Sequence, residues 1–415
     1  MATPELDETF RREWPRIVAA VIRFTGSLEL AEDAVQEAFV RAAASREREL
    51  LINPAAWITT VAKRLAIDAV RRDARLRERL PLLLDERASG LDESPGGDDR
   101  LGLLFVTCTP DLGAETRLAL ALRFVCGVST ELIADAMLVG HTTLSARLTR
   151  AKRKIEDDGI RFAPLDELDV GDRLTDVLST VHLLYTIGHT ALAGDVIVTV
   201  SITSTAIELA RAVRALMPED LETAGLLALL LLTDSRSPGR IDERGELVTL
   251  EHADRTTWDR ARIREGLDLA ALALPGGGQL ALEAGISGLH CQALAWDDTD
   301  WASICALYDR LVARWPSPAA QLARIVARSF LPARAADALD ELEALEPGLT
   351  GAAARQAVAA RADILRRLGR AADARAAYLA ARSYERNGQV SDFFGRRIAE
   401  LGDTEIAGTT PGRPV

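Results

Sequence analysis

The chain has 415 residues, of which 48% are hydrophobic and 27% are charged, so it is long enough for two to four globular domains. Its formal net charge of -12 argues against nucleic-acid binding through bulk positive charge, because an acidic chain repels polyanions at long range. The charged N-terminus shows no apolar signal region, and the longest apolar run, 226–232, is too short to cross a bilayer. We therefore expect a cytoplasmic protein without membrane contact.

Two basic islands interrupt the acidic composition, at 63–79 and 147–154. The three lysines of the chain, Lys63, Lys152 and Lys154, all lie in these islands. The net charge is -3 up to residue 160 and -9 after it. Any contact with nucleic acid must therefore come from these local islands, or be brought about by a partner protein.

The four cysteines form no Cys-x-x-Cys pair and stand in apolar or helical surroundings, which predicts buried, reduced thiols. No group of cysteine, histidine and acidic residues has metal-ligand spacing, so we expect neither a metal site nor a cofactor. The glycine-rich stretch 275–278 lacks the lysine that ends a phosphate-binding loop. No nucleophile elbow or Ser/His/Asp order is present, and we expect that the protein is not an enzyme.

Residues 5–79 are expected to be helical. In the helix predicted over 28–43, three apolar residues recur at helical spacing, and a second, mostly polar face lies beside them. The apolar residues are Ala31, Val35 and Phe39, and the second face comprises Asp33, Gln36, Glu37 and Val40.

A further helix is expected to begin at Asn53-Pro54, with asparagine as N-cap and proline at the first helical position. Its predicted apolar register runs through Trp57, Val61, Leu65 and Ala69 into an arginine-rich end. Trp57 has two interpretations: its ring can support an unstacked base, or it can pack in the core with Val61 and Leu65. The sequence leaves both open.

Residues 80–100 are rich in glycine, serine and aspartate and are predicted to form a flexible linker before a second helical domain at 101–160. Within that domain, 129–154 is typical of a helix-turn-helix with its turn at 138–141. The first helix would bury Leu132, Ile133, Ala136 and Met137, and the second would bury Leu144, Leu148, Ala151 and Ile155. Arg147, Arg150 and Lys154 form a basic stripe on another face of the second helix.

Residues 172–405, after a short acidic hinge, are rich in alanine and leucine and are predicted to be helical throughout. Residues 365–381 match half of a tetratricopeptide repeat, with glycine at the turn and small residues and a tyrosine in the following helix. The fold class predicted for the whole chain is all-α, with a tetratricopeptide-like array at its C-terminal end.

Three motifs together resemble a bacterial RNA polymerase sigma factor of the extracytoplasmic-function type. Residues 31–39 resemble the polymerase-binding helix of that family, 53–72 resemble the helices that melt and read the -10 element, and 129–154 resemble the domain that reads the -35 element. Residues 5–79 would then be sigma region 2, and 101–160 would be the helix-turn-helix of sigma region 4. The resemblance implies two partners: core RNA polymerase, and promoter DNA as -35 duplex and -10 non-template strand.

The resemblance also assigns residues to each partner. Core polymerase would be bound by Asp33, Gln36, Glu37 and Phe39; the -10 region by Asn53, Trp57, Lys63, Arg64, Arg71 and Arg72; and the -35 region by Thr142, Thr143, Arg147, Arg150 and Lys154. At two places the sequence departs from the family pattern, which limits how far these residue assignments can be carried over. Arg64 stands where the family very often has asparagine, and Gly140 and Ser145 stand where a serine N-cap and a lysine are common.

The C-terminal part resembles the long helical extension that a minority of these sigma factors carry. The resemblance rests on 301–311, preceded by the acidic run 297–300, and on the half-repeat at 365–381. It implies that the extension modulates sigma activity, with a regulatory protein or a ligand as a further partner. A free-standing helix-turn-helix regulator with a helical sensing domain is the alternative function, and an enzyme in the C-terminal half has no residue constellation in its support.

Overall fold

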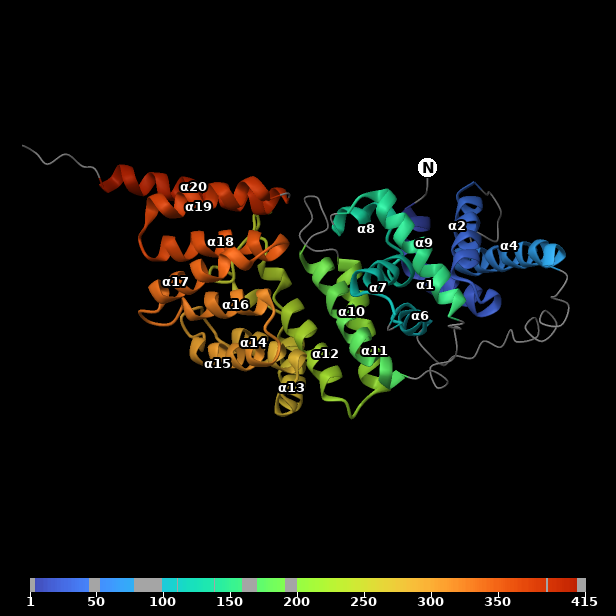
Figure 1. Ribbon diagram of the computed structural model, residues 1–415, viewed down its shortest axis with the longest axis horizontal. Helices are drawn as coiled ribbons and strands as arrows, with labels where there is room; N and C mark the ends of the chain where they lie inside the picture. The colour runs from blue at the N-terminus through green and yellow to red at the C-terminus, as the bar shows by residue number, and fades with distance from the viewer. Residues whose placement is uncertain are drawn as a thin grey trace, which may run out of the picture. The chain divides into compact units, whose positions relative to one another are not determined.

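The computed structural model describes residues 4–44, 53–77, 99–109, 111–137, 139–158, 170–190, 200–385 and 387–408. These residues form helices, with one isolated β-bridge between Ile241 and Leu247 and no strand. The predicted all-α class is therefore confirmed for the described part of the chain. The chain divides into two compact units, one of 1–192 with 198–215 and one of 193–197 with 216–415, and each is described by itself (Figure 1).

The first unit begins with three long helices, α1 (Pro4–Thr25), α2 (Leu28–Ala44) and α4 (Pro54–Arg77). All three pack against one another around Trp14, which is fully buried. Many of the positions that α2 and α4 bury are alanines, and such small side chains let two helix backbones approach closely.

The buried face of α4 differs from the predicted one. Ile58, Ala62 and Ala66 are buried, whereas Trp57, Val61 and Leu65 are only half-buried. The helix is thus rotated by one residue, or about 100°, from the register that its largest side chains favoured. Helix α4 packs against both α1 and α2, with two alanines among its buried residues.

The next helices are α6 (Asp99–Thr107), α7 (Ala114–Leu120), the π-helical turn η1 (Ala121–Val125), α8 (Thr130–Ala136) and α9 (His141–Asp157). Their core contains Leu103, Phe105, Leu120 and Phe124, all fully buried. Both α6 and η1 also pack on α1, so the segments 5–79 and 101–160, predicted as separate domains, share one core in this unit.

Two later helices, α10 (Val170–Thr190) and α11 (Val200–Leu216), complete the first unit. Val177, Val181 and Leu184 of α10 are buried, and α10 packs against α6, α7 and η1. Between α7 and α10, the nearly buried guanidinium of Arg117 forms an ion pair with the Asp176 carboxylate at 2.6 Å. The boundary between the compact units therefore falls near residue 216, whereas the sequence placed the start of the C-terminal domain at 172.

The second unit is a succession of helices and short helical turns in which neighbours along the chain pack against each other. Its elements are α12 (Leu221–Asp234), η3 (Ser237–Gly239), η4 (Arg255–Thr257), α13 (Arg260–Ala273), η5 (Leu274–Gly276), α14 (Gln279–Gln292), α15 (Trp301–Arg314), α16 (Pro318–Arg328), α17 (Ala335–Leu345), η6 (Glu346–Gly348), α18 (Gly351–Arg367), α19 (Ala371–Tyr384) and α20 (Gly388–Gly408). Figure 1 shows this stack from yellow to red.

The glycine-rich stretch at 275–278 has a structural role. The Glu222 carboxylate accepts hydrogen bonds from the backbone N–H groups of Leu280 and Ala281 and so caps α14. A Cβ at Gly278 would overlap that carboxylate, so only glycine leaves room for the cap. The acidic run at 297–300 has a similar role, because Asp300 caps α15 by accepting from the Ser303 N–H at 2.9 Å.

The half-repeat predicted at 365–381 is a helical hairpin in the structure. Helix α18 ends at a turn in which Gly369 has a positive φ of 73°, and α19 follows with Ala374, Ala377 and Tyr378 buried against it. The helix pair agrees with the prediction, and its membership in a tetratricopeptide-like array stays a proposal.

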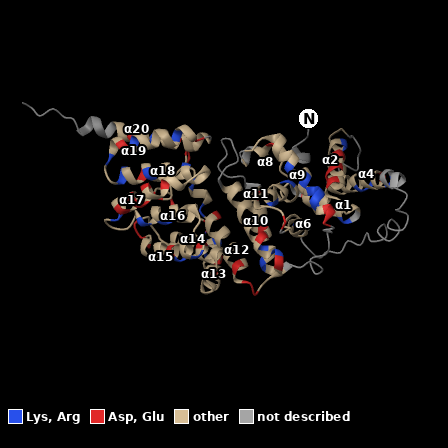
Figure 2. Cartoon of the chain, viewed as in Figure 1, with Lys and Arg blue, Asp and Glu red and all other residues tan. Residues whose placement is uncertain are grey.

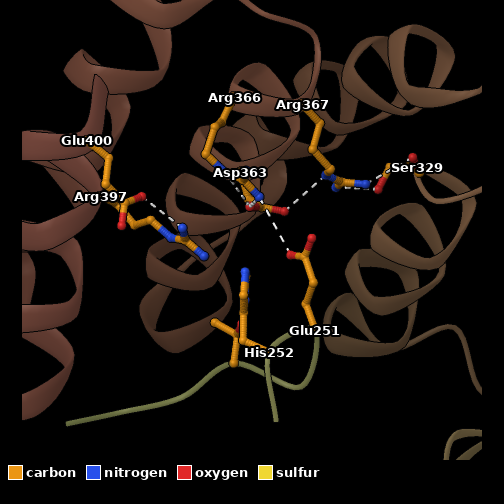
Figure 3. A network of polar contacts seen from close by, with 9 residues as sticks. Glu251, His252, Ser329, Asp363, Arg366, Arg367, Arg397 and Glu400 are labelled. Carbon is orange, nitrogen blue, oxygen red and sulfur yellow. Dashed lines mark hydrogen bonds and ion pairs between the residues drawn. The ribbon is translucent and has the colours of Figure 1, made fainter. Parts of the chain in front are cut away.

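A polar network joins the loop before η4 to α18 and to the end of α16 (Figure 3). Asp363 accepts hydrogen bonds from both Arg366 and Arg367, and Arg367 also donates to the Ser329 hydroxyl at 2.8 Å. Glu251 of the loop lies 3.7 Å from Arg366. The arginines are thus fixed by acids and a hydroxyl of their own unit.

Candidate nucleic-acid interface

Helix α9 separates an apolar face from a polar one as predicted. Leu144, Leu148, Ala151 and Ile155 are the buried residues of this helix, which confirms the predicted inward stripe. Lys and Arg residues recur along the helix in Figure 2. The packing therefore turns the apolar stripe of α9 inward and leaves Thr142, Thr143 and Arg150 exposed.

At the N-terminal end of α9, His141 lies 3.3 Å from the Glu131 carboxylate of α8. Gly140 is the N-cap in an extended conformation, and its position provides no side-chain cap. The first turn contains no acidic residue, and Thr142 and Thr143 are exposed there. Free backbone N–H groups and the positive end of the helix dipole favour phosphate at such a terminus, and the two hydroxyls add donors.

The basic stripe of α9 is largely paired with acids of the same unit. Arg147 is bound by Glu115 at 2.8 Å, and Lys154 lies 3.1 Å from Asp158 and 3.7 Å from Asp111. The hydrogen bond with Asp158 is the main reason why the pKa of Lys154 is raised. Arg150 is exposed and makes no ion pair with any described residue.

Helix α8 matches its predicted apolar face only in part. Ile133 is fully buried, but Leu132 is 50% exposed and Met137 is half-buried. The side chain of Ala136 lies outside the described residues, as does Leu138 in the turn. The helix has seven residues and rests on the core through Ile133 and Ala134, so Leu132 lies on its outer side.

Two -10 candidates lie at the start of α4. Asn53 is its N-cap, since its side-chain oxygen accepts a hydrogen bond from the Ala56 N–H at 3.1 Å. Trp57 is half-buried, so its ring contributes to packing and also keeps an accessible part. The two interpretations of Trp57 are therefore compatible: the indole can be anchored on the protein and still support a base.

The basic candidates of α4 extend along the same helix. Arg64 and Arg71 are exposed and Lys63 is half-buried, while the side chain of Arg72 lies outside the described residues. None of Lys63, Arg64 and Arg71 forms an ion pair with a described residue. These charges are thus available to a phosphate backbone.

The predicted polymerase-binding helix is α2. Asp33, Gln36 and Glu37 are exposed on one face, beside Val40, which is 63% exposed. Phe39, assigned to the same function, is only 7% exposed and its ring lies 6.2 Å from that of Trp14. Phe39 is thus a core residue that holds α2 in place, and its assignment to polymerase binding stays a prediction.

Sequence analysis missed a buried charge cluster between α2, η1 and α9. Glu32 accepts a hydrogen bond from Arg123 Nε at 2.6 Å and another from Lys152 Nζ at 3.0 Å. The Arg123 guanidinium lies 5.2 Å from the Trp14 ring centroid, and the Trp14 indole donates to the Arg123 carbonyl. The signal in the sequence was an arginine in an otherwise apolar run, 118–125, which needs a buried carboxylate as partner.

Partial burial raises the pKa of Asp33, and Lys152 counteracts that rise while Glu32 and Glu29 add to it. Asp33 thus responds to the same lysine that binds Glu32. Within the described ranges, no group of three or more histidine, cysteine or acidic residues could hold a metal ion. What the geometry offers is two basic helices for a polyanion and one acidic face for a protein.

Comparisons with known proteins agree with this geometry. A family model for sigma-70 region 2 matches residues 9–76, which span α1, α2 and α4. A model for a family of unknown function, DUF6596, matches 173–274. An uncharacterised protein of Rhizobium meliloti (strain 1021) is 38% identical over 377 residues, which are 88% of each chain. The chain belongs to the family of this rhizobial protein. No solved structure matches it significantly.

The sigma-70 region 2 match gives the N-terminal helices a sigma-factor-like role in transcription initiation. Such a region implies binding to core RNA polymerase and to promoter DNA. The DUF6596 match begins in α10 and ends in η5, so it crosses from the first compact unit into the second. Among the described helices, none is long and apolar enough to span a membrane.

Proposed function

We propose that the protein is an alternative sigma factor of the extracytoplasmic-function type, whose C-terminal helical domain modulates its activity. It binds core RNA polymerase through the exposed face of α2 and reads promoter DNA through α4 and α9. The sigma-70 region 2 match over α1, α2 and α4 is the observation that carries this proposal. Helix α9 is a second basic helix for DNA binding, and it follows α4 in the chain in the order that is expected of sigma regions 2 and 4.

In this proposal the acidic face of α2 meets a basic surface of core polymerase, and charge complementarity favours the encounter. Asp33, Gln36 and Glu37 make the contact, and Phe39 supports the helix from inside. Helix α4 holds the -10 non-template strand: Lys63, Arg64, Arg71 and Arg72 bind phosphates, and Trp57 supports a base.

Helix α9 would form region 4 together with α8 and place its N-terminal end in the major groove of the -35 duplex. Thr142 and Thr143 lie at that end, and Arg147, Arg150 and Lys154 follow on the same side of the helix. Because Arg147 and Lys154 already pair with acids, the free energy that α9 gains from DNA alone is reduced. Delivery by polymerase compensates for that loss.

The direct test is run-off transcription with purified core polymerase on promoters recovered by chromatin mapping of the tagged protein. Transcripts are expected only when both core and this protein are present. Absence of core-dependent initiation on every recovered promoter would refute the proposal. Arg64→Ala is expected to impair initiation, and the matched control is Arg375→Ala, at an exposed position of α19 in the second unit.

The alternative, a regulator that acts without polymerase, rests on the pair α8 and α9. It predicts tight, sequence-specific binding to duplex DNA by the protein alone. A gel-shift titration without core distinguishes the two functions: the sigma proposal expects only weak, salt-sensitive retention.

For the C-terminal domain we propose a regulatory role exerted through a partner protein or ligand. The test needs a truncation that leaves the first unit whole, so the chain should end after Leu216, not before α10. Altered initiation by the truncated protein supports regulation. Identical initiation by full-length and truncated protein, at equal folded concentration, would contradict it.

A further inference from the structure

The loop between η3 and η4 forms a hairpin that contacts the last helices of the second unit. Residues 240–252, which we call the strap, turn back on themselves through the β-bridge between Ile241 and Leu247. The Val248 N–H donates to the Arg240 carbonyl at 2.8 Å and closes the hairpin. Hydrogen bonds between the strap and α20 join residues that are 144 and 149 positions apart in the chain.

Helix α20 binds the backbone of the strap through side-chain donors. The Gln389 amide donates from Nε2 to the Gly245 carbonyl at 3.2 Å. The Arg396 guanidinium donates to the Leu247 carbonyl, two residues further on, also at 3.2 Å. Both donors contact main-chain oxygens, which every peptide carries. Another peptide with free carbonyl groups can therefore take the place of the strap.

The acids of the strap lie beside arginines of α18 and α20. The Glu246 carboxylate is 3.5 Å from Arg396 Nε, and the Glu251 carboxylate is 3.7 Å from Arg366 of α18 (Figure 3). These arginines belong to a stretch, 351–397, with ten arginines and four acidic residues, in a chain whose net charge is -12. The local positive charge favours an acidic peptide over a neutral or basic one.

The strap is held by weak contacts. Glu246 and Glu251 are 41% and 34% exposed, and exposed ion pairs at these distances contribute little to stability. No residue of 240–252 is buried, whereas Arg255 and Trp258, which follow it, are buried. The strap can therefore leave α18 and α20 without opening a hydrophobic core.

The strap also leaves part of its site unused. Gln389 donates through its side-chain nitrogen, but its side-chain oxygen is buried and has no hydrogen-bond partner among the described residues. Buried polar atoms are normally paired, so the empty acceptor indicates a partner that the strap does not supply. A peptide offers N–H groups as well as carbonyls, and an extended one can satisfy both ends of the Gln389 amide.

We propose that Arg366, Gln389 and Arg396 form a binding site for an acidic peptide segment of a partner protein, and that the strap occupies this site until the partner displaces it. The partner segment supplies carbonyl groups to Gln389 and Arg396, and carboxylates to the two arginines. The site itself rests on contacts within the second unit. Only its consequence for transcription rests on the regulatory role proposed above for the C-terminal domain.

Binding of a strap peptide in trans tests the site. The probe is a fluorescein-labelled peptide with the sequence of 240–252, added to the full-length protein and followed by fluorescence anisotropy. The double variant Glu246→Gln, Glu251→Gln loses both ion pairs of the strap. It should bind the probe several-fold more tightly than wild type, because the internal competitor is weakened. The control Glu243→Gln, Glu343→Gln makes the same change in net charge at exposed positions and should bind as wild type does.

Further variants locate the site. Arg396→Gln, added to the strap double variant, should abolish the gain in probe affinity, because it removes a carbonyl contact and an ion pair. Arg375→Gln, at an exposed position of α19, makes the same charge change and should keep the gain. Thermal melting establishes that each variant is folded, and Arg366→Gln gives the same test on α18 if Arg396→Gln does not fold.

Three results of these titrations would overturn the proposal. Equal probe affinity of the strap double variant and its charge control would overturn displacement of the strap. Undiminished affinity after Arg396→Gln would overturn the site. Displacement of the probe by a single-stranded DNA oligonucleotide of the same charge, as readily as by unlabelled peptide, would show a general polyanion surface and not a peptide site.

Cleavage by trypsin after Arg244 measures release of the strap without a probe. Arg244 is exposed in the turn of the hairpin. The strap double variant should be cut several-fold faster than its control, which also removes an acid close to the cleavage site; equal rates would contradict a displaceable strap. Neither assay contains polymerase or DNA. A failure of the sigma proposal would show in run-off transcription and would leave both results on the strap valid.

Discussion

Helices α4 and α9 are both basic, yet they hold their charge differently. The described cations of α4, Lys63, Arg64 and Arg71, have no acidic partner among the described residues. On α9, Arg147, Lys152 and Lys154 all pair with carboxylates of the same unit. A basic stripe in a sequence shows where positive charge lies. How much of that charge is available to bind a polyanion depends on the acidic side chains that pair with it in the fold.

The largest expected effect is the loss of stability of the first unit, which contains α4 and α9, when α10 is removed. A chain ending at residue 165 lacks α10, which buries Val177, Val181, Leu184 and Tyr185 in the first unit. At about 1.5–3 kcal/mol for each large side chain, the loss rivals the stability of a whole domain. We expect this truncation to aggregate or melt without cooperativity, and the truncation after Leu216 to melt cooperatively.

Calorimetry of the two truncated proteins checks this expectation. Similar cooperative melting of both would show that α10 and α11 are dispensable for the fold of the first unit. In that case the boundary predicted at residue 172 would be the correct one.

The next effect tests Arg64 and Arg71 of α4, which form no ion pair with a described residue. Arg64→Ala and Arg71→Ala should each weaken the polymerase-bound complex on promoter DNA, because each removes a phosphate contact. The slope of log affinity against log salt should fall by about 0.7 to 0.9 for each lost contact. Filter binding over a salt series measures it, with Arg375→Ala as the control; an unchanged slope would place these arginines away from DNA.

A smaller change in DNA affinity, an increase rather than a decrease, is expected from a substitution beside α9. Glu115 is 73% exposed and pairs with Arg147, so Glu115→Gln should cost little stability and release one cation for DNA. We expect duplex affinity of the free protein to rise about two- to fivefold at low salt. Glu343→Gln on α17 makes the same change in net charge at an exposed position of the second unit. Equal gains from both variants would mean that only net charge matters.

A further effect concerns the second unit and its acid stability. Burial, with Arg236 and Arg255 nearby, lowers the pKa of His290 to about 3. The unfolded chain binds this proton near pH 6.5 and the folded chain does not, so the second unit should lose stability as the pH falls from about 6.5 towards 3. His290→Gln should flatten that part of the profile, and His252→Gln, an exposed control, should not. Urea melts at several pH values measure the slope.

Much of the local structure could be predicted from the sequence. The buried stripe of α9, the Asn53 cap and the hairpin around Gly369 follow from helical spacing and from cap and turn chemistry. The four cysteines are free, and Cys108, Cys291 and Cys305 are buried. Burial raises the pKa of Cys108 to about 12, as expected for an inert thiol.

What could not be predicted is which face meets which partner. Helical periodicity placed Leu132 in the core, but it is 50% exposed, whereas Phe39, which the resemblance assigned to polymerase binding, is only 7% exposed. The predicted register of α4 followed its largest side chains, although Ile58, Ala62 and Ala66 are the buried residues. The Glu32 cluster joins residues far apart in the chain, and no local pattern carries such information.

The central claim is that the protein directs core polymerase to open a promoter. Permanganate reactivity of unpaired thymines near the -10 element, on a promoter recovered by chromatin mapping, tests it most directly. The account predicts reactivity only when core polymerase and this protein are both present, and its loss in Arg64→Ala. Reactivity with core alone, or none with both proteins on any recovered promoter, would contradict the account.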